Sequence, residues 1–526
     1  MSQGVPSVGD RVNGADLLLQ AAGSQSGRQR LAIQTRQRSV CYGDLETKTC
    51  QYGRALRTLG VGRQDRILLL LDDRPEMFYC YLAAMKIGAV PVALNLRLSD
   101  RELAFIVTDS DCRLIVTEAD YAALCHSACT DLPGAPVIVE SGDVHEQAIN
   151  LDGLAAEQSG ELESVLLEPD EMALWMYTSG TTGTAKGAVH RLASIADIGR
   201  YFEAVFGVGP GDRIFCSSKL FFAFALGHSF LATLRLGATA VLHTGWPSAA
   251  AIAGVVDDLR PDIVLSVPTL YRRVLADGLA GSAGFKSVRH YISAGEHLPV
   301  RMFDEWQAVT GHAILDGIGA TETLIMFVAN GPEYNCRGAT GKLLPATQVR
   351  LKSHVGLEIT EAGLPGVAWV RSATLAVGYW HQEDKTAAVF QDGWYCTGDV
   401  FVRDSDGYFF YQGRDDDMLK ISGQWVSPTE IEAEVLQNPN VREAAIVGIS
   451  DEQGLIRLAL CLVSENPEID RGVLQAELTR QLTANLSVYK CPRRFVYLDH
   501  MPKTATGKVQ RFKLRQFAAD QLGPSL

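Results

Sequence analysis

Residues 177–187 read Tyr177-Thr178-Ser179-Gly180-Thr181-Thr182-Gly183-Thr184-Ala185-Lys186-Gly187 and follow an apolar, strand-like run over 172–176. The stretch combines glycines, small hydroxyl residues and one lysine. Glycines let backbone N–H groups approach a polyanion closely, the hydroxyls add donors, and the lysine adds a positive charge. The pattern indicates a phosphate-binding loop; the alternative is a plain polar loop between a strand and a helix. It is not a Walker A loop, because Lys186 stands three residues after Gly183 and a glycine follows it.

Length and charge limit the possible classes of protein. The chain has 526 residues, too many for one hydrophobic core, so we expect two or more domains. It is 47% hydrophobic and 21% charged, which is ordinary for a soluble globular protein. The net charge of −13 and the lack of a long basic run argue against nucleic acid as a partner. An anionic substrate would need local basic groups.

The cysteines and the N-terminus predict a cytoplasmic protein. Eleven cysteines are scattered without a C-x-x-C pair. The close pair Cys125 and Cys129 fits two small residues on one helix face better than metal ligands. Residues 1–10 are polar and lack the apolar core of a signal peptide. The longest aliphatic run, Ile67–Leu71, is far too short to span a membrane.

Strand and helix patterns alternate through the first 270 residues. Such alternation predicts a largely parallel α/β sheet. We expect helices over 15–22, 42–59 and 75–87, and one opened by the capping box Ser99-Asp100-Arg101-Glu102. We expect strands over 31–35, 66–71, 89–94, 114–117, 208–214, 238–243 and 263–267.

The sequence changes character after residue 340. Glycines punctuate short strands over 340–412, as in a small β-barrel or an array of hairpins. An acidic triplet, Asp415-Asp416-Asp417, follows. Beyond it we expect a helix capped by Ser427, strands over 444–449 and 455–463, and a helix over 471–486. We therefore predict a large domain over residues 1–413 and a small one over 414–526.

Three further stretches carry groups suited to nucleotide chemistry. Asp316-Gly317-Ile318-Gly319-Ala320-Thr321-Glu322 places a carboxylate where a divalent cation could bind, or is a tight turn before a helix. Tyr395-Cys396-Thr397-Gly398-Asp399 is a turn whose carboxylate could accept two ribose hydroxyl bonds. Pro502-Lys503-Thr504-Ala505-Thr506-Gly507-Lys508 is a basic loop, which alone would be solvated surface.

Taken together and in this order, the motifs resemble the signatures of the adenylate-forming superfamily, which includes acyl-CoA synthetases, luciferases and the adenylation domains of peptide synthetases. The motifs are T-S-G-T-T-G-x-x-K-G, G-x-G-A-T-E, Y-x-T-G-D, G-R-x-D-D and P-K-T-x-T-G-K, and the resemblance covers nearly the whole chain. It implies an α/β fold with a large N-terminal domain of parallel α/β subdomains and a small β-barrel-like part. A small, mobile α+β C-terminal domain would follow.

The resemblance also implies roles for single residues. The phosphate loop with Lys186 would hold ATP, Thr321 would touch phosphate, and Glu322 would hold Mg²⁺. Gly295, Glu296, Asp316 and Gly317 would border the adenine, and Asp399 and Arg414 would bind the ribose. Asp416 would be the hinge, Lys420 would serve the second half-reaction, and Gly423 would line the pantetheine tunnel. Lys508 would be the catalytic lysine of the first half-reaction.

The chemistry explains why such groups are needed. A carboxylate attacks the α-phosphorus of ATP and pyrophosphate leaves; a thiol then attacks the acyl adenylate and AMP leaves. Two anions meet in the first step, so Mg²⁺ and Lys508 would supply preorganised positive charge. Family members run both steps in one site by rotating the small domain.

The segment Ser218 to His228 and residues 317–332 look like the benzoate–CoA ligase branch. Those enzymes usually show F-A-Y-G-L-G-N and a histidine three residues after T-E; here Phe224, His228 and Ile325 stand at the departing positions. The acyl pocket would be lined by Tyr201, Phe224, Ala225, Ala294, Gly319, Leu324 and Ile325. An apolar slot with an aromatic wall suits an unsubstituted ring. A cinnamate-like or alicyclic acid stays open, and the other phenylalanines of the segment are expected in the core.

The sequence therefore predicts an ATP-dependent aryl acid–thiol ligase, with benzoate as the acid and CoA as the acceptor, acting as a monomer or homodimer without nucleic acid or membrane. A carrier-protein phosphopantetheine is the rival acceptor. A catalytically silent acyl-adenylate sensor or scaffold is the rival of another class, opposed by the presence of Lys186, Glu322, Asp399 and Lys508. The missing Walker A motif opposes a P-loop phosphotransferase, and the motifs alone leave luciferase-like oxidation open.

Overall fold

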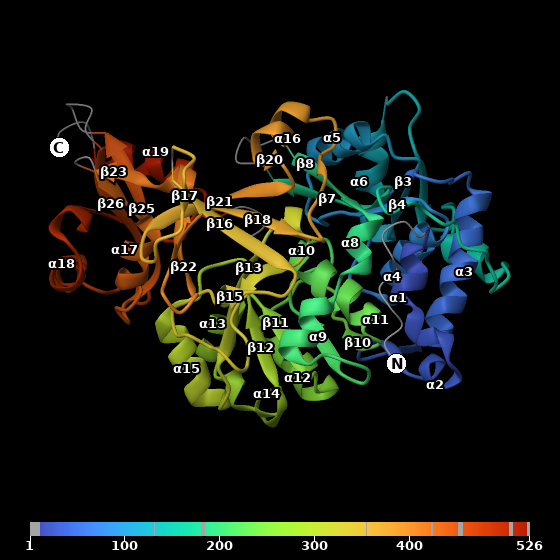
Figure 1. Ribbon diagram of the computed structural model, residues 1–526, viewed down its shortest axis with the longest axis horizontal. Coiled ribbons are helices and arrows are strands. Elements are labelled where there is room, and N and C mark those ends of the chain that lie inside the picture. Colours follow the sequence, from blue (N-terminus) through green and yellow to red (C-terminus); the bar gives the residue numbers. More distant parts are fainter. Residues whose placement is uncertain are drawn as a thin grey trace.

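The computed structural model describes residues 11–130, 132–179, 185–353, 355–421, 424–450, 456–503 and 509–522, with the backbone alone at residues 179, 420, 424, 425 and 522. The molecule is elongated, with the first helices at one end of the long axis, the last helices at the other, and a strand-rich part between them (Figure 1). Among the described residues, no helix combines the length and the apolar character needed to cross a membrane.

A seven-stranded sheet carries the start of the site. Its order is β19-β8-β7-β4-β3-β5-β6, parallel from β7 to β6 and antiparallel at the other edge. The strands are β3 (Arg66–Leu70), β4 (Val90–Ala93), β5 (Leu114–Thr117), β6 (Val137–Glu140), β7 (Met172–Ser179), β8 (Ala185–Arg191) and β19 (Gly378–Tyr379). The helices of this region are α1 (Gly14–Leu18), α2 (Gln25–Arg28), α3 (Tyr42–Thr58), α4 (Pro75–Lys86), α5 (Asp100–Ser110), α6 (Ala119–Cys129) and α7 (Leu151–Ala156).

A nine-stranded sheet carries most of the remaining site residues. Its order is β15-β14-β13-β12-β11-β9-β10-β1-β2, with parallel pairing from β13 to β1. The strands are β1 (Leu31–Gln34), β2 (Ser39–Cys41), β9 (Arg213–Cys216), β10 (Thr239–Val241), β11 (Ile263–Ser266), β12 (His290–Ser293), β13 (Ile314–Gly319), β14 (Met326–Ala329) and β15 (Lys342–Leu343). Parallel strands end at the same edge of a sheet, so the segments after β9, β12 and β13 converge there.

Helices of this second region include α8 (Leu192–Ala196), α9 (Arg200–Phe206), α10 (Ala223–Ala225), α11 (Thr233–Arg235), α12 (Ala249–Leu259), α13 (Pro268–Ala276), α14 (Ala283–Ser287) and α15 (Val300–Thr310). One turn of π-helix, Leu226–Ala232, joins α10 to α11. Its Phe230 packs on Phe78 of α4 with ring centroids 4.0 Å apart. This buried contact joins the helices of the two sheets in one hydrophobic core.

The glycine-punctuated part forms an open antiparallel sheet of hairpins. Its order is β17-β16-β18-β21-β20, with β22 also paired to β21. The elements are β16 (Thr347–Lys352), β17 (Glu358–Ile359), β18 (Pro365–Ser372), α16 (Glu383–Val389), β20 (Phe390–Gln391), β21 (Trp394–Arg403) and β22 (Phe409–Arg414).

The C-terminal part is a small α+β unit with a core of its own. The hairpin β23 (Leu419–Ile421) and β24 (Gln424–Val426) precedes a sheet of β25 (Val441–Ser450), β26 (Ile456–Ser464) and β27 (Arg494–Tyr497). Helices α17 (Pro428–Val435) and α18 (Arg471–Asn485) cover one face, and α19 (Arg511–Leu522) covers the other. The predicted fold class is confirmed; the exact boundary at 413/414 stays a prediction.

Local predictions mostly hold, and the exceptions have causes. Both hydrogen bonds of the Ser99–Glu102 capping box are present, and Ser427 caps α17 as predicted. The helix expected over 15–22 is α1 followed by a 3-10 helix, Gln20–Gly23. The strand expected over 208–214 is wrong, because Gly209, Pro210 and Gly211 hold that stretch in a loop, and β9 starts only at Arg213.

Two of the motifs lie in other elements than predicted. The described parts of residues 177–187 belong to two antiparallel strands, β7 and β8, so a strand and not the helix of the alternative interpretation follows this stretch. The Tyr395–Asp399 motif is not a turn but part of strand β21, within which Gly398 alone takes a left-handed φ of +72°.

Candidate functional site

Lys186 stands on strand β8 rather than in the loop before it. Thr178 of β7 lies opposite Lys186 in the hairpin. The Lys186 Nζ lies 4.3 Å from the centre of the Tyr379 ring. Burial lowers the pKa of Lys186, and the Glu322 carboxylate works against that shift. The lysine is therefore held beside Glu322 at the end of the hairpin.

Glu322 is held from several sides. It is 6% exposed and lies in a 3-10 turn, Thr321–Thr323, directly after β13. Its Oε1 accepts a hydrogen bond from the Tyr379 hydroxyl at 2.6 Å, and its backbone carbonyl accepts one from the Ala376 N–H at 2.7 Å. Since β19 pairs with β8, the fold brings Lys186, Thr321, Glu322 and Tyr379 together from segments far apart in sequence.

Asp399, Arg414 and Asp416 form a second cluster. Arg414 lies opposite Asp399 in the β21–β22 ladder, and its Nη1 donates to the Thr397 carbonyl at 2.7 Å and to Asp399 Oδ1 at 3.2 Å. Its Nε lies 3.6 Å from Asp416 Oδ1. Burial opposes the charge, but Asp399 and Asp416 hold the pKa of Arg414 above its usual value. The predicted ribose ligands and the predicted hinge are thus in direct contact.

The two clusters adjoin through a tyrosine. Burial raises the pKa of the Tyr395 hydroxyl, and the nearby charges of Glu322 and Asp399 raise it further. The predicted phosphate, metal and ribose groups therefore share one region of the molecule.

The residues predicted to border the adenine lie at the ends of neighbouring strands. Asp316 of β13 pairs with Ser293 of β12, after which come Gly295, with a φ of +87°, and Glu296. The Glu296 carboxylate accepts hydrogen bonds from the Thr269 N–H at 3.1 Å and from its hydroxyl at 2.6 Å, so it holds the start of α13. A Cβ on Gly317 would lie 2.6 Å from Met326 Sδ and 2.9 Å from Ala329 Cβ, so a side chain there would require these neighbours to shift.

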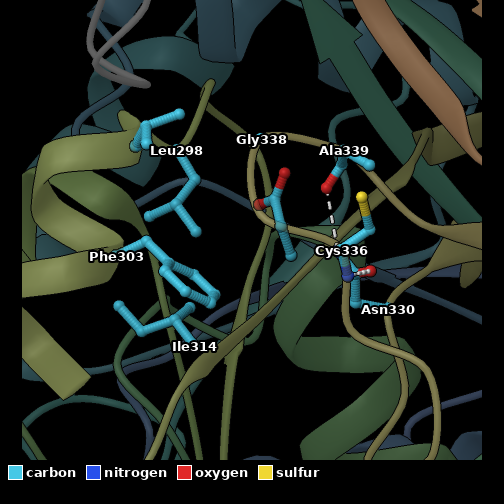
Figure 2. A pocket seen from close by; sticks show the side chains of 9 residues that line it. Leu298, Phe303, Ile314, Asn330, Cys336, Gly338 and Ala339 are labelled. Carbon is cyan, nitrogen blue, oxygen red and sulfur yellow. Dashed lines mark hydrogen bonds between the residues drawn. The ribbon is translucent and has the colours of Figure 1, made fainter.

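Burial raises the pKa of Asp316 well above its usual range. Beside it is a cavity with a free volume of about 10 Å³, lined by side chains that include Leu298, Phe303 and Cys336 (Figure 2). The Asn330 side chain at its wall donates to the Ala339 carbonyl. That volume suits one water molecule and not a purine.

The predicted aryl pocket gathers around His228. Its ring contacts Tyr201 and Phe224, with centroids 5.7 and 5.3 Å away. Tyr201 and His228 are each 1% exposed, on α9 and the π-helix respectively. Neither the Tyr201 hydroxyl nor the His228 Nε2 has a hydrogen-bond partner in the part of the chain that the structure describes. The residues around the expected apolar slot therefore include two buried polar groups without a partner in the described part of the chain.

The π-helix packs closely against the backbone of Leu324. A Cβ on Gly227 of the π-helix would lie 2.3 Å from the Leu324 carbonyl oxygen and 3.2 Å from Ile325 Cγ2. Leu324 itself has a φ of +63°, a strained conformation of the kind that gathers at functional sites. Ala225, Ala294 and Ile325 are buried nearby in the same core, and Gly319 is exposed at the end of β13.

The remaining predicted residues cannot be placed from their side chains. Gly180, Thr181, Thr182 and Gly183 of the phosphate loop, Gly423 and Lys508 lie outside the described residues. Ser179 and Lys420 are described by their backbone alone, in β7 and β23.

Sequence reasoning missed several groups that hold the site. Tyr379 carried no motif signal, because its contact with Glu322 joins positions 57 residues apart. Lys219, 2% exposed, donates to Asp72 Oδ1 at 2.6 Å and to the His243 carbonyl at 2.9 Å. It ties the start of the aryl segment to the residues that follow β3 and β10. The sequence signal for this role of Lys219 was a lone lysine in an apolar stretch.

Comparisons with known proteins agree with this geometry. The family model described as AMP-binding enzyme matches residues 19–380, and that described as AMP-binding enzyme C-terminal domain matches 430–508. A 3-hydroxybenzoate–CoA ligase of Aromatoleum sp. (strain CIB) is 42% identical, covering 96% of this chain and 97% of the relative. A benzoate–CoA ligase of Thauera aromatica is 38% identical, covering 91% and 90%.

The fold agrees as well. The crystal structure of the anthranilate CoA ligase AuaEII in complex with anthranoyl-AMP is similar with a TM-score of 0.91 and 32% identity, covering 97% of this chain and 98% of that one. The chain therefore belongs to the AMP-binding, adenylate-forming enzymes, within their branch of AMP-forming aromatic acid–CoA ligases.

Proposed function

We propose that the chain is a hydroxybenzoate–CoA ligase, with 3-hydroxybenzoate as the first acid to test. The observation that carries the proposal is the pair of buried polar atoms on the two contacting rings Tyr201 and His228, the Tyr201 hydroxyl and the His228 Nε2, neither with a partner in the described part of the chain. The acid in the name of the 42% identical relative supports the same choice.

His228 is a neutral imidazole with its proton on Nδ1. Its Nδ1 lies 2.7 Å from the Phe224 carbonyl oxygen, which can only accept, so Nδ1 carries the proton. Burial lowers the pKa of His228 to about 4, so the ring is neutral at pH 7. Its Nε2 is then a bare acceptor, and the Tyr201 hydroxyl can supply a donor.

A phenolic hydroxyl on the substrate matches both groups. It would donate to His228 Nε2 and accept from Tyr201. An unsubstituted ring would leave both buried groups unpaired, at about 1–3 kcal/mol each. Sites built to bind a substrate hydroxyl reject analogues that lack it for this reason.

The chain's own residues would divide the work as follows. The acid's carboxylate attacks the α-phosphorus and pyrophosphate leaves; the thiol of CoA then attacks the acyl carbon and AMP leaves. Thr178 and Lys186 would bind phosphates, and Asp399 and Arg414 the ribose. Lys508 would stabilise charge in the first step and Lys420 in the second. Most of the catalysis is then positioning and electrostatics.

The residues present fit Mg²⁺. The described residues hold no group of three or more histidines, cysteines or carboxylates that could bind an ion unaided. Mg²⁺ commonly takes one or two carboxylates plus substrate phosphates, and Glu322, 6% exposed and near Lys186, can be that carboxylate. The ion would supply positive charge to the phosphates.

We expect 3-hydroxybenzoate to exceed benzoate and 2-aminobenzoate in kcat/KM, measured as pyrophosphate release with CoA. Tyr201→Phe should lower kcat/KM for 3-hydroxybenzoate about tenfold, since one hydrogen bond is lost, and leave benzoate nearly unchanged. Tyr81→Phe is a matched control, because its hydroxyl is also buried and unpaired among the described residues but its ring packs on Phe230.

Equal losses for both acids in Tyr201→Phe, or a native preference for benzoate, would contradict the hydroxybenzoate assignment. Benzoate is the second candidate, because Phe224 and Ile325 present no polar group. Replacing CoA by a phosphopantetheinylated carrier protein in the same assay separates the two acceptors.

A further inference from the structure

His190 lies on β8, the strand that carries Lys186, close to the segments around Glu322. It is 0% exposed, four residues along β8 from the lysine. Its Nε2 lies 3.0 Å from the Thr321 carbonyl oxygen and its Nδ1 lies 3.1 Å from the Thr374 carbonyl oxygen. Whichever ring nitrogen carries the proton, the imidazole donates to one of these two carbonyls.

Both carbonyls belong to segments that hold Glu322. Thr321 is the residue before it. Thr374 begins the segment that leads to β19, and its hydroxyl donates to the Thr323 carbonyl at 2.7 Å. The same segment supplies the Ala376 N–H and the Tyr379 hydroxyl to Glu322. The His190 ring thus stands where the strand of Lys186 meets both segments around the carboxylate.

We propose that His190 is a positioning residue that fixes Glu322 relative to Lys186, so that the carboxylate and the lysine bind the same Mg²⁺–ATP. Lys186 and Glu322 come from different segments, 136 residues apart in the sequence. Besides the apolar packing of β8, the imidazole adds a hydrogen bond between these segments. The proposal rests on the proposed metal role of Glu322 and not on which acid is used.

Loss of the imidazole has a specific consequence. An apolar ring of similar size would fill the space but remove the donor from the carbonyl that accepts the imidazole N–H, and the 3-10 turn that carries Glu322 would move. Partners that orient a metal ligand typically change metal affinity 10–100-fold when replaced. The substitution should weaken the binding of Mg²⁺–ATP and leave the rates of the later steps unchanged.

The test compares three variants of the full chain. His190→Phe should weaken Mg²⁺–ATP binding, measured by calorimetry without acid, about 10-fold or more, and leave binding of ATP in EDTA nearly unchanged. His190→Gln, whose amide N–H can reach a carbonyl, should recover most of the loss. His290→Phe is the matched control, because His290 is half-buried at the opposite, amino end of parallel strand β12.

Thioester formation from supplied aroyl-AMP and CoA should be normal in both His190 variants. Equal losses in His190→Phe and His190→Gln, or equal weakening with and without Mg²⁺, would overturn the proposal. If Glu322→Gln also left the Mg²⁺ dependence unchanged, the metal role of Glu322 would fail instead.

A second measurement covers the case in which His190→Phe does not fold. His190→Val removes the imidazole donor with a smaller side chain that suits a strand, and Tyr379→Phe removes the hydrogen bond to Glu322, so their effects on Mg²⁺–ATP affinity should be strongly non-additive. Additive effects would mean that His190 does not act through Glu322, and the proposal would be wrong.

Discussion

Among single residues, Glu322 has the most demanding environment. Its carboxylate is nearly inaccessible, accepts the Tyr379 hydroxyl, and lies close enough to Lys186 to oppose the fall in that lysine's pKa. A buried carboxylate needs a compensating partner. Lys186 supplies part of that compensation, and the proposed Mg²⁺ would supply the rest.

We predict that Glu322→Gln folds normally, because an amide oxygen can still accept the Tyr379 hydrogen bond. It should raise the Mg²⁺ concentration needed for adenylation at least about tenfold, since a neutral amide cannot balance the ion's charge. A Mg²⁺ titration of pyrophosphate exchange measures this. Glu333→Gln, at an exposed position, is the control, and an unchanged Mg²⁺ dependence in Glu322→Gln would remove Glu322 from the metal site.

At the scale of elements, the π-helix Leu226–Ala232 shapes the aryl pocket. A π turn inserts an extra residue into a helix and is frequent at functional sites. Here the Thr233 hydroxyl donates to the His228 carbonyl at 2.8 Å, and Gly227 faces the backbone of Leu324. Helix and loop therefore fit closely, and neither can shift without changing the pocket.

We predict that Gly227→Ala lowers the thermal stability and raises the KM for the acid, because the added methyl would meet the Leu324 carbonyl at 2.3 Å. Overpacking of this kind costs about 1–3 kcal/mol. Gly209→Ala is the control, since a Cβ there meets nothing within 4 Å. If the two variants had the same melting temperature and the same KM, the close fit would not matter for the pocket.

At the scale of the whole molecule, the small C-terminal unit joins the body at Arg414 to Asp417. Arg414 contacts both Asp399 and Asp416, so the predicted ribose site and hinge share one side chain. On the C-terminal side of the predicted hinge, Arg511 of α19 pairs with Glu432 at 2.6 Å and with Asp417 at 3.4 Å. These contacts tie the start of the unit to its helices α17 and α19.

We predict opposite defects for the two lysines of this unit. Lys508→Ala should suppress acyl-AMP formation and spare thioester formation from supplied acyl-AMP, and Lys420→Ala should do the reverse. The loss of a well-placed charged donor costs about 10²–10³ in rate. Single-turnover assays of each half-reaction measure both. Equal loss of both steps in both variants would contradict the two-conformation mechanism.

Stiffening the hinge is an independent check on domain rotation. Asp416→Pro should slow thioester formation and leave adenylation nearly intact, because proline fixes φ at the predicted pivot. The same half-reaction assays apply. A proline variant that is slow in adenylation alone would place the pivot elsewhere.

The sequence by itself determined the fold class, the two-part organisation and the family. Hydrophobic alternation, capping residues such as Ser99 and Ser427, and motif order depend on local chemistry, which is written along the chain. It also named Lys186, Glu322, Asp399 and Arg414, which the fold brings into two adjoining clusters.

Only the tertiary structure decided which polar groups meet. Tyr379 reaches Glu322, His190 reaches two carbonyls and Lys219 reaches Asp72 through strand pairings and crossings that no local pattern specifies. The pocket shows the same limit. Phe224 and Ile325 alone suggested an apolar slot, but burial and the Phe224 carbonyl set the tautomer of His228 beside Tyr201. That arrangement depends on contacts between α9 and the π-helix, which form only when the chain is folded.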